Sequence, residues 1–151
     1  MSHGFERKPG ITKYLPRVIP PPFSGIAVAV DYANIALDPD IPLYERYCAV
    51  STAVRLLATL RREHLVVSVY RLLKDSGLCK RFRDIDIDIC ENIKREDDYS
   101  VIEKFVEIIN TCENGDIPVT EELVLALAQA IIVTLVPQLK TLVSSQMPEE
   151  I

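Results

Sequence analysis

Five aspartates come nearest to a reactive site in this sequence: Asp31, Asp84, Asp86, Asp88 and Asp116. The middle three alternate with isoleucines, a period of two that predicts a strand with carboxylates along one face. Crowded carboxylates repel one another and raise each other's pKa unless a cation relieves the repulsion. A divalent metal held by Asp86, Asp88 and Asp31 would relieve it and could support phosphodiester hydrolysis. The alternative is that these aspartates form the solvated face of an edge strand.

A short stretch around Asp31 supports the metal interpretation. The string IAVAVDYANI, residues 26–35, resembles the first strand of NYN/PIN-like ribonuclease domains. In that family an Asp at the strand end and an Asn three residues later belong to the site, and Asp31 and Asn34 match them. The later Ser-Gly-Asp segment of the family is missing, with Asn114-Gly115-Asp116 as its nearest counterpart, and the C-terminal half lacks the family's alternating pattern. The resemblance implies a metal-dependent ribonuclease as one alternative function.

Other kinds of catalytic site have less support. His64 is the sole histidine beyond the first few residues, and the sequence has neither a GxGxxG nor a P-loop motif. The four cysteines are dispersed without a CxxC pair, which is typical of reduced thiols in an intracellular protein and not of a zinc site. We therefore expect a protein that is not an enzyme, with no cofactor and no bound metal.

The charges are unevenly distributed along the chain. Residues 55–83 contain eight basic and two acidic side chains, whereas residues 84–122 contain thirteen acidic and three basic ones. The basic segment predicts either phosphate contacts to RNA or pairing with the acidic segment, within one chain or across an interface. Lys80 to Arg83 also form a short cluster of the kind that directs nuclear import, an alternative to a cytoplasmic location. The candidate contact residues are Arg55, Arg61, Arg62, Arg71, Lys74, Lys80, Arg81 and Arg83.

The segment Thr120 to Val143 predicts the central helix of the fold. Within Leu123–Val136 only Gln129 and Thr134 are polar, so a helix here must be enclosed on nearly every side. Thr120 can cap its N-terminus. A helix of fourteen residues is about 21 Å long and a bilayer core about 30 Å thick, so we expect a core helix and no membrane span.

Three further segments have helical periodicity: Leu43 to Arg62, Leu65 to Lys74 with a stop at Gly77, and Ser100 to Cys112. Gly25–Leu37 fits a buried strand and a helix equally well. The Arg83–Asn92 stretch predicts a short strand, whose partner would be Ile26–Val30.

Residues 1–24 predict an extended arm, because they are rich in proline and include the run Pro20-Pro21-Pro22. The arm also contains apolar and aromatic side chains, so we expect it to dock on its own domain or on a neighbouring subunit. The residues expected to dock are Tyr14, Leu15, Ile19 and Phe23.

We therefore expect a mainly α fold: four to five helices around the central apolar C-terminal helix, with the Pro-rich arm and a short two-stranded element. The expected divisions are an arm at 1–24, a single helical domain at 25–147 and a short tail at 148–151. A small chain has few ways to hide a helix that is apolar all round, so we expect self-association into a dimer or higher oligomer. The expected function is an intracellular interaction and assembly protein that binds itself and another protein, of the kind viruses use for structure or regulation, with RNA binding as the first alternative.

Overall fold

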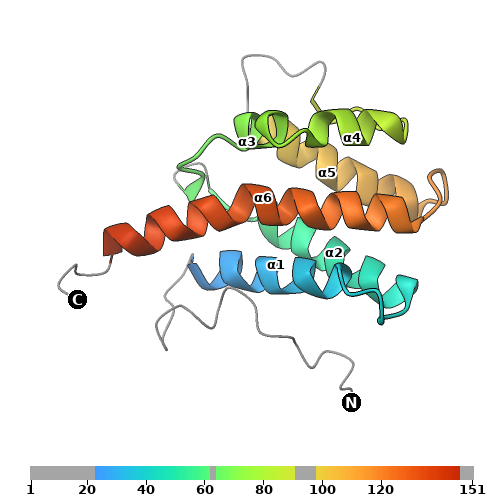
Figure 1. The fold of residues 1–151 in the computed structure, drawn as a ribbon, viewed down its shortest axis with the longest axis horizontal. Coiled ribbons are helices and arrows are strands. Elements are labelled where there is room, and N and C mark those ends of the chain that lie inside the picture. The colour runs from blue at the N-terminus through green and yellow to red at the C-terminus, as the bar shows by residue number, and fades with distance from the viewer. Residues whose placement is uncertain (1–22, 62–63, 91–97, 147–151) are drawn as a thin grey trace.

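The computed structural model of the protein describes residues 23–61, 64–90 and 98–146 (Figure 1). Within these ranges the chain is helical and contains no strand, which confirms the mainly α class. The helices are α1 (Phe23–Ala36), α2 (Leu43–Leu57), α3 (Val69–Asp75), α4 (Leu78–Asp84), α5 (Asp98–Glu113) and α6 (Glu121–Gln146). The predicted arm lies outside the described residues except for Phe23 and Ser24, which begin α1.

Helix α6 runs through the middle of the fold, between the α1–α2 pair and the α3–α4 pair (Figure 1). It packs against α1, α2, α3 and α4, while α5 packs on α2 and α3. Leu127, Ile131 and Leu135 of α6 are fully buried. Thr120 caps the helix as predicted, because its Oγ1 accepts a hydrogen bond from the Leu123 N–H at 3.1 Å.

The length argument against a membrane span was wrong, because α6 is much longer than the apolar run predicted. It continues through Pro137 to 26 residues, about 39 Å. Its segment Glu121–Thr141 is long and apolar enough to cross a bilayer, and 61% of the most apolar window is buried within the protein. The length of α6 therefore does not distinguish a core helix from a membrane span. Its burial against the other helices is a property of core helices.

Gln138 is a buried polar residue that ties α6 to the segment before α3. Its Oε1 accepts a hydrogen bond from the Val67 N–H at 2.8 Å, and its Nε2 donates to the Val67 carbonyl at 2.6 Å. One side chain therefore satisfies both backbone groups of a residue that belongs to no helix. This pair fixes the chain's approach to α3, whose N-cap is Ser68.

Arg46 joins three helices at the opposite end of α6. It is 3% exposed, and its Nε donates to the Ala36 carbonyl at the end of α1 at 2.8 Å. Its Nη2 lies 3.8 Å from Glu121 Oε2 in the first turn of α6. A cation at a helix C-terminus is favourable, so this arginine stabilises the end of α1 while it pairs with α6.

The Gly25–Leu37 segment forms helix α1 and not a strand. Ala29, Ala33 and Ala36 recur at intervals of four and three and are almost fully buried. Small side chains on one helical face allow close approach of neighbouring backbones, and α1 makes its most extensive contacts with α2 and α6. The helical alternative that the pattern left open is thus the one that forms.

The strand predicted at Arg83–Asn92 was wrong for the residues described there, and the two-stranded element is not formed within the described ranges. Helix α4 continues to Asp84, and the chain then turns at Asp86, a non-glycine residue with a φ of 63°. Ile85 and Ile87 pack partly against the core and Ile89 is buried. The three isoleucines contact the core from an irregular segment. Their alternation with aspartates has the same period as a strand, so the pattern alone cannot distinguish the two backbones.

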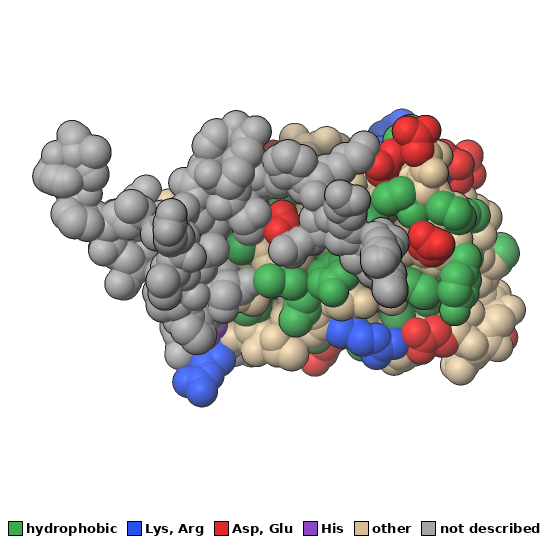
Figure 2. All heavy atoms as spheres, turned by 90° about the horizontal axis from the view of Figure 1, so that it is seen from below, with side chains coloured by type: hydrophobic (Ala, Val, Ile, Leu, Met, Phe, Trp, Pro, Cys, Tyr) green, Lys and Arg blue, Asp and Glu red, His purple; other side chains and the backbone are tan. Residues whose placement is uncertain are grey.

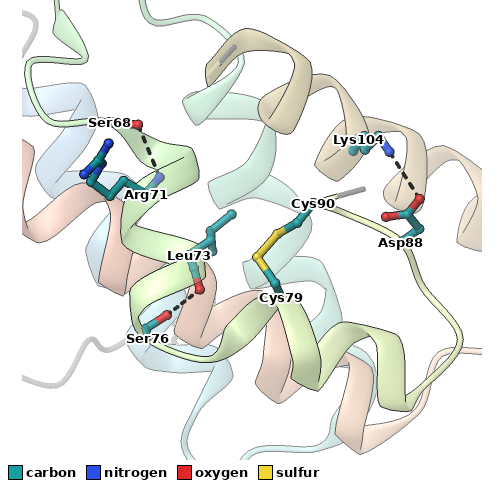
Figure 3. The surroundings of a disulfide bond; sticks show 8 residues. All are labelled: Ser68, Arg71, Leu73, Ser76, Cys79, Asp88, Cys90 and Lys104. Carbon is teal, nitrogen blue, oxygen red and sulfur yellow. Dashed lines mark hydrogen bonds and ion pairs between the residues drawn. A yellow bond between two sulfur atoms is a disulfide. The ribbon is translucent and has the colours of Figure 1, made fainter. Parts of the chain in front are cut away.

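A disulfide links Cys79 in α4 to Cys90, which follows the turn (Figure 3). The prediction of reduced thiols was therefore wrong for this pair, while Cys48 and Cys112 are free. The two bonded cysteines stand eleven residues apart, a spacing that matches no familiar motif in the sequence. Between them, Asp88 Oδ2 lies 3.7 Å from Lys104 Nζ on α5, so the bridged segment is also tied to α5.

We expect the disulfide to stabilise the domain by closing a short loop. By the chain-entropy relation, replacing both Cys79 and Cys90 with serine should lower the free energy of unfolding by about 3 kcal/mol. Urea unfolding of both proteins, with and without reductant, measures this loss. Reduced wild type should match the double variant, and Cys48→Ser serves as the single-thiol control. A wild-type midpoint that does not move on reduction would contradict the prediction.

Replacement of Gln138 by leucine should leave the Val67 N–H and carbonyl without their partner. We expect the free energy of unfolding to fall by about 2 kcal/mol. Thr134→Val is the matched control on the same helix, because the Thr134 hydroxyl donates only to carbonyls of its own preceding turn. Chemical denaturation of the two variants should show the larger loss for Gln138→Leu, and equal losses would count against the anchoring role.

Candidate interaction surface

The aspartates of the predicted metal site are dispersed in the structure. Asp31 lies within α1 and is 3% exposed, so it does not stand at the end of a strand. Asp84 and Asp86 are exposed at the end of α4, and Asp88 is near Lys104. Among the described residues, no group of three or more His, Cys, Asp or Glu side chains is arranged to hold a metal. The IAVAVDYANI string is helical, so its resemblance to the first strand of NYN/PIN-like domains does not extend to the structure.

Several residues of the basic segment interact within the chain. Arg55 Nη2 lies 2.8 Å from Glu113 Oε2 on α5, and Lys80 Nζ lies 3.8 Å from Asp84 Oδ2 within α4. Arg81 donates to the Gln129 side chain on α6. The first two pairs each join a residue of the basic segment 55–83 to a residue of the acidic segment 84–122. Pairing of the two segments within one chain was one of the alternatives predicted.

The other described basic residues are exposed. Arg71 and Lys74 are exposed on α3, Arg83 is exposed on α4, and Arg61 is exposed beyond the end of α2. Arg62 lies outside the described residues. The described positions thus come from α2, the segment after its end, α3 and α4, and three of them, Arg55, Lys80 and Arg81, have partners within the chain.

The structure instead gathers aromatic and thiol side chains into a cleft of about 520 Å³ between α2, α5 and the α5–α6 loop. The α2 residues recur at intervals of three and four, which places them on one face of that helix. The opposite wall comes from the end of α5 and from the loop before α6. The lining residues are Leu43, Tyr44, Tyr47, Cys48, Ser51, Cys112, Glu113 and Val119.

The two tyrosines of the cleft differ in exposure. Tyr44 is 75% exposed, one of the two large hydrophobic side chains exposed in the described part of the chain, the other being Val66. Tyr47 is 7% exposed, and its hydroxyl donates to the Ile109 carbonyl of α5 at 3.4 Å. Burial raises the pKa of Tyr47 to about 12, with smaller contributions from Cys112 and Glu113. Tyr47 thus forms the floor of the cleft, and Tyr44 stands at its rim.

The free thiols act as small apolar groups in this cleft. Cys112 is 8% exposed, and burial followed by the charge of Glu113 raises its pKa. A thiol with a raised pKa stays protonated at neutral pH and is a poor nucleophile. A hydrogen bond with the Cys48 side chain is the main cause that raises the pKa of Tyr44. Cys112 therefore contributes to the cleft as a small, half-apolar group and not as a thiolate.

Glu113 lines the cleft and pairs with Arg55, and further acidic side chains are exposed at the end of the fold where α2 and α6 start. Glu45 is exposed in the first turn of α2, and Asp116, Glu121 and Glu122 are exposed around the start of α6. On the face shown in Figure 2, hydrophobic side chains gather at the end where α1 stops and α2 starts, with acidic side chains beside them. A partner for this end of the molecule should therefore combine apolar and basic groups.

Sequence analysis missed this cleft, although half of its signal was present. Tyr44, Tyr47, Cys48 and Ser51 have helical spacing within a segment correctly predicted as a helix. The opposite wall lies about sixty residues further along the chain, and no pattern in the sequence indicates that α5 ends beside the start of α2.

Tyr47 should make the protein lose stability in alkali. Its pKa is about 12 in the folded chain and about 10 in the unfolded chain, so the unfolded state releases its proton first as the pH rises. The stabilisation is complete below pH 10 and is lost between pH 10 and 12, at about 1.4 kcal/mol per pH unit. Urea unfolding from pH 9 to pH 11.5 should show a smaller slope for Tyr47→Phe than for wild type. An unchanged slope in Tyr47→Phe would contradict the assignment.

Comparison of the chain with protein-family models, with curated proteins and with solved structures gives no match. The function proposed below therefore rests on the chain's own residues and geometry.

Proposed function

We propose that this chain is an interaction and assembly protein that associates with a second copy of itself through the cleft between α2 and α5. The observation that carries the proposal is Tyr44, a tyrosine 75% exposed at the rim of an apolar cleft. Tyrosines are enriched among the residues that dominate binding energy at protein interfaces, because they offer a large rigid apolar area with a polar end. Nothing within the described chain covers this side chain.

The reason for self-association changes from the one expected from sequence. From the sequence we expected a second copy to cover the apolar C-terminal helix. In the structure the chain's own helices enclose α6, and Leu127, Ile131 and Leu135 are fully buried. The surface that remains to be covered is the cleft. Its two tyrosines, Leu43 and Val119 provide the apolar area, and the Arg55–Glu113 pair lies at its edge.

RNA binding, the first alternative, has weaker support. Electrostatic binding to phosphates requires several basic side chains directed to one surface. Arg55, Lys80 and Arg81 instead face partners within the chain. The basic residues left exposed on α3 and α4 stand among Asp75 and Asp84, which are also exposed.

The disulfide bears on the proposed location. Disulfides persist in oxidising compartments and in intracellular proteins of hyperthermophiles, and are rare in other cytosolic and nuclear proteins. The Cys79–Cys90 pair therefore favours one of the first two settings over the cytoplasm or nucleus expected from sequence.

Light scattering coupled to size exclusion tests self-association directly. At about 50 μM protein, wild type should elute as a dimer of twice 17.0 kDa. Tyr44→Asp should weaken the association at least about 30-fold, corresponding to a hot-spot loss of about 2 kcal/mol. Val66→Asp is the matched control, because Val66 is the second large hydrophobic side chain that is exposed among the described residues. It precedes Val67, which binds Gln138 far along α6 from the cleft. A monomeric wild type would overturn self-association, and equal weakening by both variants would overturn the assignment to the cleft.

A further inference from the structure

The α2–α5 cleft and the side chain that protrudes beside it belong to one surface of the molecule. Tyr44 stands at the rim and is 75% exposed, so its ring does not fill the cleft of its own chain. An interface between two identical copies about a two-fold axis needs a protruding group and its receptacle on the same surface patch. The surface around the cleft provides both.

The cleft has the size and the chemistry of a site for a tyrosine side chain. Its volume of about 520 Å³ is within the range of pockets that hold small organic molecules. Tyr47, Cys112 and Val119 provide apolar walls, and Glu113 is the charged residue among those that line the cleft. A tyrosine has an apolar ring and a hydroxyl that can donate a hydrogen bond, so it matches apolar walls that include one carboxylate.

We propose that two copies of the chain exchange Tyr44: the ring of each Tyr44 enters the cleft of the other copy, packs against Tyr47 and Val119, and its hydroxyl donates to Glu113. This inference rests on the proposed function, because it names the side chain that each copy places in the other's cleft. Each copy gives one tyrosine and receives one, so both clefts are filled and the assembly closes as a dimer.

Glu113 can accept this hydrogen bond while it pairs with Arg55. A carboxylate has two oxygens with about four acceptor positions in total, and Arg55 Nη2 approaches Oε2 at 2.8 Å. Both side chains of the pair are about half exposed, so the carboxylate remains accessible from the cleft. The pair also joins the α2 and α5 walls, which keeps the receptacle in place before a partner arrives.

The entering side chain is also held in place before binding. Tyr44 stands in the first turn of α2, and the adjoining end of α1 is tied to that turn because Arg46 Nε donates to the Ala36 carbonyl. A tyrosine on a fixed helix loses the freedom of two side-chain torsions when it binds. The entropy cost of the exchange is therefore small for the apolar area that it covers.

A mixture of two complementary variants tests the exchange in the full-length chain. Tyr44→Ala removes the entering side chain and keeps the cleft, whereas Val119→Trp keeps Tyr44 and fills the cleft. Each homodimer then lacks both contacts, but a heterodimer of the two variants retains one of them. If each homodimer is about 30-fold weaker than wild type, the heterodimer should be about fivefold tighter than either homodimer, because the two contacts are equal and their effects multiply. Analytical ultracentrifugation measures the three affinities.

Two further variants serve as controls. A chain with both Tyr44→Ala and Val119→Trp has no tyrosine to give, so its mixture with Tyr44→Ala should stay as weak as the Tyr44→Ala homodimer. Tyr44→Phe keeps the ring and loses the hydroxyl, so it should weaken the dimer about tenfold through the lost hydrogen bonds to Glu113. A Tyr44→Phe dimer as tight as wild type would overturn the contact with Glu113.

The native thiol of Cys48 provides a measurement that requires no change in the cleft. Cys48 is free and lines the cleft, so an entering tyrosine should cover it. We expect the rate at which N-ethylmaleimide modifies Cys48, followed by mass spectrometry of its peptide, to fall as wild type is concentrated through the range in which it dimerises. In Tyr44→Ala this dependence on concentration should be lost. The measurement decides the question even if Val119→Trp does not fold.

The outcomes separate the exchange from the proposed function. If wild type dimerises but the mixture is no tighter than the homodimers, or Cys48 reacts at the same rate in monomer and dimer, self-association stands and the exchange of Tyr44 is overturned. If wild type is monomeric at every concentration tested, both the function and the inference are overturned.

Discussion

The burial of α6 is the constraint on which the other elements depend. Its apolar surface is continuous around the helix, so one covering layer is insufficient, and the chain provides the α1–α2 pair on one side and the α3–α4 pair on the other. Both ends of α6 are fixed by polar contacts, Arg46 with Glu121 at the start and Gln138 with Val67 near the end. Burial of the apolar stretch favours folding, whereas these polar contacts hold α6 against α1, α2 and the segment before α3.

The sequence allowed the strongest helices to be predicted, because their signals are local. The apolar run of α6, its Thr120 cap and the stop at Gly77, where φ is 81°, each depend on a few adjacent residues. Residues 83–90 were predicted wrongly for the opposite reason. Ile85, Ile87 and Ile89 contact core residues that are distant in the sequence. Cys79 and Cys90 are joined across a turn. The alternation of isoleucine and aspartate indicates that every second residue is buried. It does not indicate whether the backbone is a strand or an irregular segment.

Sequence analysis missed the cleft because only one of its walls has a local signal, while the other depends on long-range packing. The α2 wall is a local pattern of Tyr44, Tyr47 and Cys48, but a helical face with two tyrosines is also typical of a core face. The cleft exists because Cys112 and Val119 approach from α5 and the following loop, which is a property of the fold as a whole. The basic segment illustrates the same limit. Its charges lie within thirty residues of one another in sequence, but the fold places Arg55 against Glu113 on α5 and Arg81 against Gln129 on α6.

The acidity at the end of the fold where α2 and α6 start has a structural origin. Glu45, Glu121 and Glu122 stand in the first turns of α2 and α6, where carboxylates stabilise a helix by roughly 0.3–1 kcal/mol each through its dipole. Because both helices start at the same end of the fold, these local preferences add up to one negative region. The helix dipoles offset part of this charge at the backbone but leave the exposed carboxylates available to cations in solvent. The same packing that encloses α6 therefore gathers exposed carboxylates at the end of the fold where α2 and α6 start.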